Sequence, residues 1–177
     1  MIAKMGRWMA GAFVVLALGA SAARVQFFGG GMNVSGAIGL SAPIGDLGQR
    51  GGTGFGAATR TESQIGSENW SLRGDFSFDR FAGKAGVDSY QFYTVATNLV
   101  HRSSPKLYQF GGFGLYTATT AVSADNSRTE SAFGFQGGMG LNLTTKGLKT
   151  FLEFGITDVL TVRRSSVWFP VRFGIRI

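Results

Sequence analysis

Charged residues in this sequence recur at alternate positions of segments that otherwise consist of small and apolar residues. Opposite charges can form ion pairs, and two close carboxylates can share acid–base work. Asp75 and Asp79 lie four positions apart, roughly 13 Å along an extended strand, which is too far for a carboxylate dyad. Because buried charges must be paired, we predict a structural network of four basic and four acidic side chains inside the protein: Arg60, Glu62, Arg73, Asp75, Asp79, Glu153, Arg172 and Arg176.

The sequence offers little other chemistry. It contains no cysteine and a single histidine, His101, so we expect neither a thiolate nor a multi-histidine metal site. The glycine-rich stretch 51–56 resembles a phosphate-binding loop, but an extended pattern follows it in place of the helix that such a loop needs. No basic stripe is interleaved with aromatic residues, which argues against nucleic-acid binding. We predict no catalytic residue, no cofactor and no metal.

The first 22 residues have the three parts of a secretory signal peptide. A basic start with Lys4 and Arg7 precedes an apolar run over 8–18, and Ala20-Ser21-Ala22 gives the small-residue pattern that signal peptidase recognises. The run is about half the length of a membrane-spanning helix, which needs about 20 apolar residues. We predict a cleaved signal peptide over 1–22 and a single domain over 23–177.

The elements that position the charged residues are extended strands. Apolar and polar residues alternate strictly over 70–79, 132–144 and 166–177, and less regularly over 32–41, 55–62 and 150–157. Two further segments, 88–101 and 106–117, have aromatic residues in both parities. In the second, the outward set is predicted to change from Tyr108 and Phe110 to Phe113 and Leu115, through a bulge at Gly111-Gly112.

These eight segments predict an all-β fold, an eight-stranded antiparallel up-and-down transmembrane β-barrel. The connections centred on 43–52, 81–87, 119–128 and 159–165 are modestly longer than those centred on 63–68, 102–105 and 145–147. Longer loops face the cell exterior in such barrels, and an even number of strands leaves both termini in the periplasm. His101 then lies at a periplasmic turn.

If the apolar faces of the strands point outward, the barrel lies in lipid, and if they point inward, the barrel is soluble in water. An eight-stranded barrel has an interior just wide enough for side chains to fill. The polar faces carry Gly, Ser, Asn, Thr and the paired charges, whereas the apolar faces carry Phe, Leu, Val and Ile, which are too bulky to be enclosed together. An exposed apolar belt of that size requires a membrane. A soluble ligand-binding barrel, with the two faces reversed, is an alternative.

Residues near the strand ends are candidates for contact with the membrane surface. Four aromatic residues are candidates for interface girdles: Trp70, Phe78, Tyr116 and Phe169. Arg163 and Arg164, in a predicted outer loop, are candidates for contact with anionic lipopolysaccharide.

Several stretches resemble the small eight-stranded outer-membrane β-barrel families, which include OmpA-like transmembrane domains and opacity-type proteins. They are Gly39-Leu40-Ser41-Ala42-Pro43-Ile44-Gly45-Asp46-Leu47, Leu72-Arg73-Gly74-Asp75-Phe76, Gly111-Gly112-Phe113-Gly114-Leu115-Tyr116 and the C-terminal Phe173-Gly174-Ile175-Arg176-Ile177. The C-terminal stretch is similar to the strand by which such proteins are recognised for assembly, although Ile177 stands where an aromatic residue is usual.

The resemblance implies a monomer in the bacterial outer membrane that contacts outer-membrane lipids and, during biogenesis, the barrel-assembly machinery. It also implies a structural or surface-interaction role rather than an enzymatic one. Two alternatives remain within the same architecture. Rearranged arginine–carboxylate pairs would make a narrow gated pore for small solutes or ions. A lipid-modifying acyltransferase would need a loop nucleophile near a histidine, and His101 is predicted at the opposite end.

Overall fold

The computed structural model describes residues 32–84, 86–123, 126–145, 147–161 and 165–177. The predicted signal peptide over 1–22 and the two arginines Arg163 and Arg164 lie outside the described residues. Among the described residues, no helix is long and apolar enough to cross a membrane.

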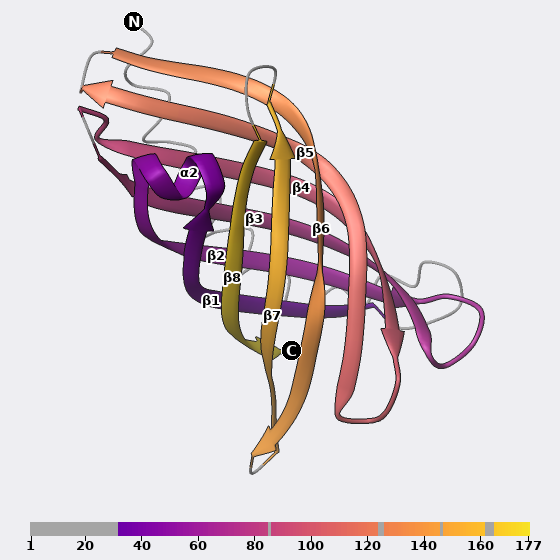
Figure 1. The fold of residues 1–177 in the computed structure, drawn as a ribbon. Coiled ribbons are helices and arrows are strands. Elements are labelled where there is room, and N and C mark those ends of the chain that lie inside the picture. Colours follow the sequence, from indigo (N-terminus) through magenta and orange to yellow (C-terminus); the bar gives the residue numbers. More distant parts are fainter. Residues whose placement is uncertain (1–31, 85, 124–125, 146, 162–164) are drawn as a thin grey trace, which may run out of the picture.

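The predicted eight-stranded barrel is confirmed. Each strand pairs antiparallel with its neighbour in sequence, and β1 pairs with β8 to close the barrel (Figure 1). The strands are β1 Asn33–Ile44, β2 Gly51–Gln64, β3 Trp70–Gly83, β4 Ser89–Arg102, β5 Leu107–Ser123, β6 Asn126–Thr145, β7 Leu148–Leu160 and β8 Ser165–Arg176. Closure leaves no open sheet edge around the wall, as a lipid environment demands.

A short helix, α2 (Gly45–Arg50), joins β1 to β2 and was not predicted from the sequence. The chain enters it through Gly45, whose φ of +56° is a conformation that glycine adopts without strain. Asp46 in the first turn and Arg50 in the last complement the helix dipole. Leu47 is buried and points into the barrel. Six residues are too few for a helical period to stand out in the sequence.

We call the end of the barrel that holds α2 the helix end, and the opposite end, which holds Ile177, the terminal end (Figure 1). The prediction of longer connections at the helix end is wrong for the β5–β6 hairpin. Its strands extend to Ser123 and Asn126, so the ladder takes up most of the stretch 119–128. Threonines in this stretch favour the extended conformation because their branched side chains fit a pleated surface.

The two ambiguous segments, 88–101 and 106–117, form β4 and β5, and in each strand inward and outward side chains alternate without interruption. In β4, Tyr90 and Phe92 point inward and Tyr93 points outward. In β5 the pairing runs without a break through Gly111 and Gly112, so the predicted bulge is wrong. Tyr108 and Phe110 therefore share the inward face with Tyr116. The error came from assigning every aromatic residue of the segment to the outer face.

Glycines on neighbouring strands make room for the inward aromatic rings. Gly140 lies across from Tyr108, and a Cβ there would stand 2.1 Å from the ring carbon Cζ of Tyr108. A Cβ at Gly174, opposite Phe151, would stand 2.1 Å from Cζ of Phe151. The rings thus lie flat over strand positions that have no side chain. Part of the high glycine content, 28 of 177 residues, is explained by this packing.

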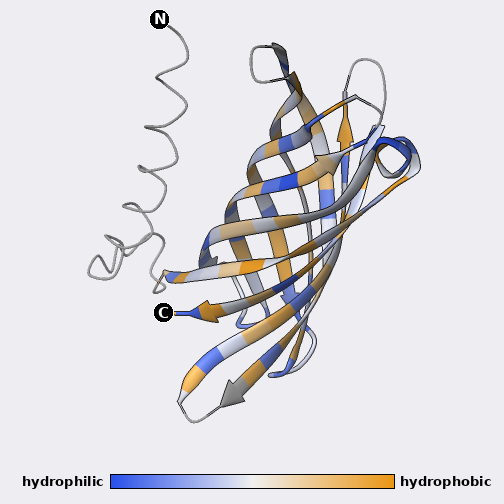
Figure 2. Ribbon diagram, turned by 90° about the vertical axis from the view of Figure 1, so that its left-hand side faces the viewer, coloured by the Kyte–Doolittle hydropathy of each residue, from blue (hydrophilic) through white to orange (hydrophobic). Residues whose placement is uncertain are grey.

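Large apolar side chains cover the outside of the barrel. Ile38 and Phe133 are 69% and 63% exposed, and exposed Leu, Phe, Val, Ile or Met side chains occur on all eight strands. Hydrophobic and hydrophilic segments alternate along the strands, as the two faces require (Figure 2). The sorting of apolar residues outward and charges inward therefore matches the prediction.

Candidate functional site

The barrel interior holds the candidate site, and six of its charged side chains form one group that we call the charged layer. Arg60 comes from β2, Arg73, Asp75 and Asp79 from β3, Glu153 from β7 and Arg172 from β8, and all six are buried. The strict alternation of each strand brings these residues to the inner face. Four strands thus contribute to one group of three cations and three anions.

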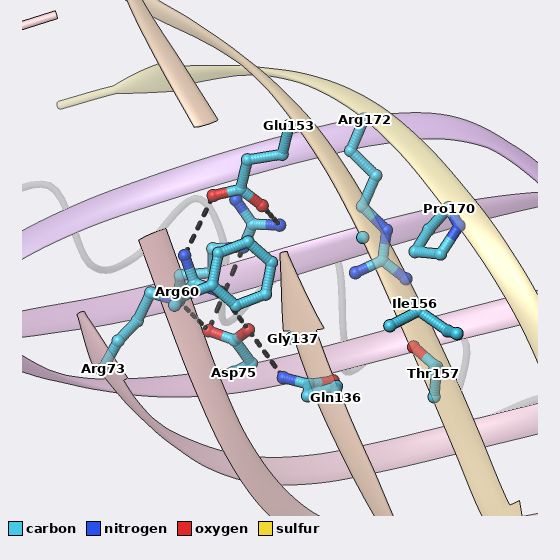
Figure 3. A pocket seen from close by; sticks show the side chains of 12 residues that line it. Arg60, Arg73, Asp75, Gln136, Gly137, Glu153, Ile156, Thr157, Pro170 and Arg172 are labelled. Carbon is cyan, nitrogen blue, oxygen red and sulfur yellow. Dashed lines mark hydrogen bonds and ion pairs between the residues drawn. The ribbon is translucent and has the colours of Figure 1, made fainter. Parts of the chain in front are cut away.

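Glu153 is the centre of the charged layer (Figure 3). Its Oε2 lies 2.6 Å from Nη2 of Arg60, and its Oε1 lies 2.9 Å from Nη1 of Arg73. The hydroxyl of Tyr108 donates a third hydrogen bond to Oε1, at 2.7 Å. One carboxylate therefore joins two guanidinium groups that would otherwise repel each other in a low dielectric.

Asp75 extends the charged layer across the barrel. It lies on β3 two residues from Arg73, whose Nη2 donates to Oδ2 of Asp75 at 3.1 Å. The amide Nε2 of Gln136 approaches the same oxygen at 3.1 Å and Oδ1 of Asn98 at 3.0 Å. Gln136 and Asn98 come from β6 and β4, so polar bonds reach strands that contribute no charge to the layer.

The ion pair of Arg172 and Asp79 lies closer to the helix end. Nη2 of Arg172 donates to Oδ2 of Asp79 at 2.7 Å, and the hydroxyl of Ser41 donates to the other carboxylate oxygen at 3.0 Å. These contacts join β8, β3 and β1 through the lumen. The predicted long separation of Asp75 and Asp79 holds, and each binds a different arginine.

Two residues at the terminal end differ from the predicted network. Glu62 pairs with Arg102, which the sequence reasoning placed in a turn rather than in the interior. Arg176 has no carboxylate partner among the described residues. Its Nη1 donates to Oδ1 of Asn142 at 2.7 Å, and its guanidinium lies 5.2 Å from the ring centre of Tyr108. Arg102 is the last residue of β4, where alternation is hardest to detect.

A second group fills the interior at the helix end, and we call it the aromatic layer. It was not predicted. Trp168 is its centre, with ring centres 4.7 Å from Phe92, 5.6 Å from Phe81 and 6.3 Å from Tyr116. Leu47 of α2 covers it from above. The members of the aromatic layer are Leu47, Phe81, Tyr90, Phe92, Tyr116, Ala118, Ala132, Val159 and Trp168.

The aromatic layer corrects one of the proposed girdle residues. Tyr116 is 1% exposed, and its hydroxyl donates to Oε1 of Gln136 inside the barrel, so it is not at a membrane interface. Trp70, Phe78 and Phe169 do lie on the outer face. The ring of Trp70 packs against His101 in a tilted arrangement with ring centres 4.5 Å apart, and Phe78 packs in the same way against Tyr93 at 5.0 Å. Their role as interface girdles stays a prediction.

The described interior holds a small cavity but no metal-ligating cluster. No group of three or more His, Cys, Asp or Glu side chains that could hold a metal occurs in the part of the chain that the structure describes. A cavity next to the charged layer has a volume of about 20 Å³, which is room for one water molecule. The charged layer and the aromatic layer both occupy the lumen, one with paired charges and the other with packed rings.

The fold and the site define a small up-and-down β-barrel with an apolar exterior and a charged interior. No family model matches the sequence, and no curated protein matches it. Solved structures do match the fold. Ail, the attachment invasion locus protein of Yersinia pestis, superposes with a TM-score of 0.61 and 14% identity over 84% of this chain and 99% of that chain.

Two further structures give the same result. Neisserial surface protein A, NspA, has a TM-score of 0.62 and 13% identity over 82% of this chain and 96% of that chain. The N-terminal β-barrel domain of Pseudomonas aeruginosa OprF has a TM-score of 0.50 and 11% identity over 82% of this chain and 97% of that chain. The resemblance seen in the sequence is thereby confirmed for the fold.

Proposed function

We propose that this chain is an integral protein of the bacterial outer membrane whose lumen is sealed and whose β5–β6 hairpin contacts other macromolecules. Its exterior supports the membrane location. Apolar side chains such as Phe133 and Leu40, 63% and 64% exposed, would aggregate in water but dissolve in lipid. A soluble ligand-binding barrel would need these residues inside. With both termini in the periplasm, the helix end faces the cell exterior.

The observation that carries the surface role is the uneven pairing of β6. On one side β6 pairs with β5 as far as Ser123 and Asn126, but on the other it pairs with β7 only from Phe133 and Leu160 onward. We propose that the edge of 127–132 away from β5, beyond the last β6–β7 pair that the described residues show, is free. A free edge presents unpaired N–H and C=O groups to an extended polypeptide, which can add as a further strand.

Side chains of the hairpin fit a location outside the membrane. Ser127, Arg128, Thr129 and Ser131 are exposed, in contrast to the apolar residues that follow from Phe133. The amide of Asn142 donates toward β5, to the carbonyl of Lys106, so alternation directs the amides of Thr129 and Ser131 to the free edge.

Binding to an array of immobilised octapeptides tests this role, with the protein held in lipid nanodiscs. Thr129→Pro removes one free-edge donor and spares the β5 ladder, so we expect peptide affinity to fall about fivefold. Thr129→Val keeps the amide and is the matched control. If no peptide binds, or if both variants bind as the unmodified protein does, the hairpin is not an edge-binding site.

The sealed lumen is tested by planar-bilayer recording. Paired charges and packed rings support a plug rather than the gated-pore alternative, and we expect no discrete channel events at any voltage. Reproducible single-channel steps from the purified barrel would favour the pore instead. Contact of Arg163 and Arg164 with lipopolysaccharide, a monomeric state and dependence on the barrel-assembly machinery complete the proposal.

A further inference from the structure

The wall of the barrel has an irregularity at Pro170, in the middle of β8. Proline has no N–H to donate and is normally confined to edge strands or bulges. Here β8 pairs on both sides, with β1 and with β7. The β7–β8 ladder pairs Phe154 with Val171 and Thr157 with Trp168, but shows no pair between them. Continuing the flanking register places Gly155 opposite Pro170.

The missing donor belongs to the β7 side of the proline. The amide of Ile177 donates to the carbonyl of Val34 on β1, and backbone groups alternate in direction along a strand. Residues of one strand that differ by an odd number direct their backbone groups to opposite neighbours. Ile177 and Pro170 differ in this way, so the backbone nitrogen of Pro170 faces away from β1 and toward Gly155 on β7. The carbonyl of Gly155 therefore lacks its ladder donor. Inside a membrane such a group costs free energy unless another donor satisfies it.

Gly155 and Pro170 are both among the residues that line the cavity of about 20 Å³. Its lining includes Gly155, Ile156 and Thr157 of β7 and Pro170 and Arg172 of β8, together with members of the Glu153 group. In Figure 3 the side chains of Arg172, Pro170, Ile156 and Thr157 lie together, apart from the Glu153 group. Nε of Arg172 is buried and has no hydrogen-bond partner, while its Nη2 binds Asp79. The residue with an unused donor and the residue with the unused acceptor thus line the same cavity.

We propose that this cavity is a binding site for one water molecule that replaces the missing rung of the ladder. The water accepts a hydrogen bond from Nε of Arg172 and donates one to the carbonyl of Gly155. A volume of this size suits one water, and buried waters typically join polar groups that have no other partner. The site links the β7–β8 seam to the charged layer through Arg172 and Asp79.

Two variants and one control test the site by different routes. Gly155→Ala fills the cavity, since a Cβ there would stand 3.5 Å from both Cζ of Phe110 and Cγ of Pro170 and 3.1 Å from the carbonyl oxygen of Gly137. Pro170→Val restores the amide that the ladder lacks. Gly111→Ala is the matched control, because its Cβ would meet nothing within 4 Å.

The first measurement is the nuclear Overhauser effect between water and the Hε proton of Arg172, with the protein in lipid nanodiscs. We expect the signal in the unmodified protein and in Gly111→Ala, and its loss in Gly155→Ala. We also expect Gly155→Ala to raise the unfolding equilibrium constant about tenfold, because the carbonyl loses its water. Absence of the signal from the unmodified protein, or its persistence in Gly155→Ala, would overturn the proposal.

Pro170→Val keeps the proposal testable if Gly155→Ala does not fold. The new amide of residue 170 is expected to be as protected from hydrogen exchange as the amide of Arg172, because it bonds to the carbonyl of Gly155. The unfolding equilibrium constant should fall. Rapid exchange of that amide would show that the ladder has no free acceptor at Gly155.

Discussion

The charged layer and the aromatic layer fill the same lumen by opposite physical means. In the charged layer, Glu153 satisfies Arg60 and Arg73 at hydrogen-bonding distance, so removal of one group leaves the others uncompensated. In the aromatic layer, Trp168 contacts its neighbours through ring packing, which depends on volume and much less on any single partner. The comparison teaches that ion pairs and packed rings can each occupy part of one narrow lumen, and that the two layers should respond differently to substitution.

The largest effect is expected in the charged layer. Glu153→Gln keeps the size of the side chain but removes the closest carboxylate of Arg60 and one of the two carboxylates of Arg73, which leaves Asp75 as their remaining shared counter-ion. Breaking a buried ion pair in this way costs about 3–5 kcal/mol of unfolding free energy. The measurement is a urea unfolding titration of the protein in lipid vesicles. The folded fraction is read from the different gel mobilities of the folded and the unfolded protein.

The control for that substitution is Glu68→Gln. Glu68 is exposed, and such surface changes usually stay within about 0.5 kcal/mol. Equal effects of the two substitutions would mean that the charged layer stabilises the barrel no more than a solvated surface charge does.

A smaller loss is expected in the aromatic layer. Trp168→Leu removes ring contacts but leaves an apolar side chain that its neighbours can repack around, so we expect a loss of about 2 kcal/mol by the same unfolding assay. Planar-bilayer recordings of this variant should stay silent, because the charged layer still fills the lumen. Channel steps from Trp168→Leu would show that the aromatic layer alone seals the barrel.

The smallest effect is expected at the terminal end, where Arg102 pairs with Glu62. The side chain of Arg102 is 26% exposed, so solvent screens this pair more than the central ones. A double-mutant cycle with Arg102→Gln and Glu62→Gln should give a coupling of about 1 kcal/mol that weakens in 1 M salt. The corresponding cycle for Arg73 and Glu153 should be nearly independent of salt.

Sequence reasoning predicted the strands, the closed barrel and the inward direction of the main charges, because a period of two assigns each residue to one face. It could not predict partners across the lumen. Which arginine meets which carboxylate depends on strand register and barrel closure, so the contact of Arg176 with Asn142 and the pairing of Arg102 with Glu62 were missed.

The aromatic layer was missed for a different physical reason. Tyr116 was expected at a membrane interface, and Trp168, although its parity places it on the same face as Arg172, was not expected to be the centre of a packed group, because a narrow lumen cannot enclose many large rings. Glycines on the adjacent strands supply the room: a Cβ at Gly134 would stand 2.7 Å from the ring of Tyr116. The pairing of a ring with a glycine across the ladder becomes visible only once the register is known.

The central claim is that the barrel is sealed and faces lipid. Fluorescence quenching of Trp70 and Trp168, the two tryptophans that follow the predicted signal peptide, tests it most directly. Trp70 lies on the outer face, 39% exposed, and Trp168 lies in the lumen, 1% exposed. Variants Trp168→Phe and Trp70→Phe each keep one of them. The account predicts that brominated lipids strongly quench Trp70 and spare Trp168, and that aqueous acrylamide hardly reaches Trp168. Strong quenching of Trp168 by brominated lipids, or folded protein in water with Trp70 open to acrylamide, would contradict a sealed barrel that faces lipid.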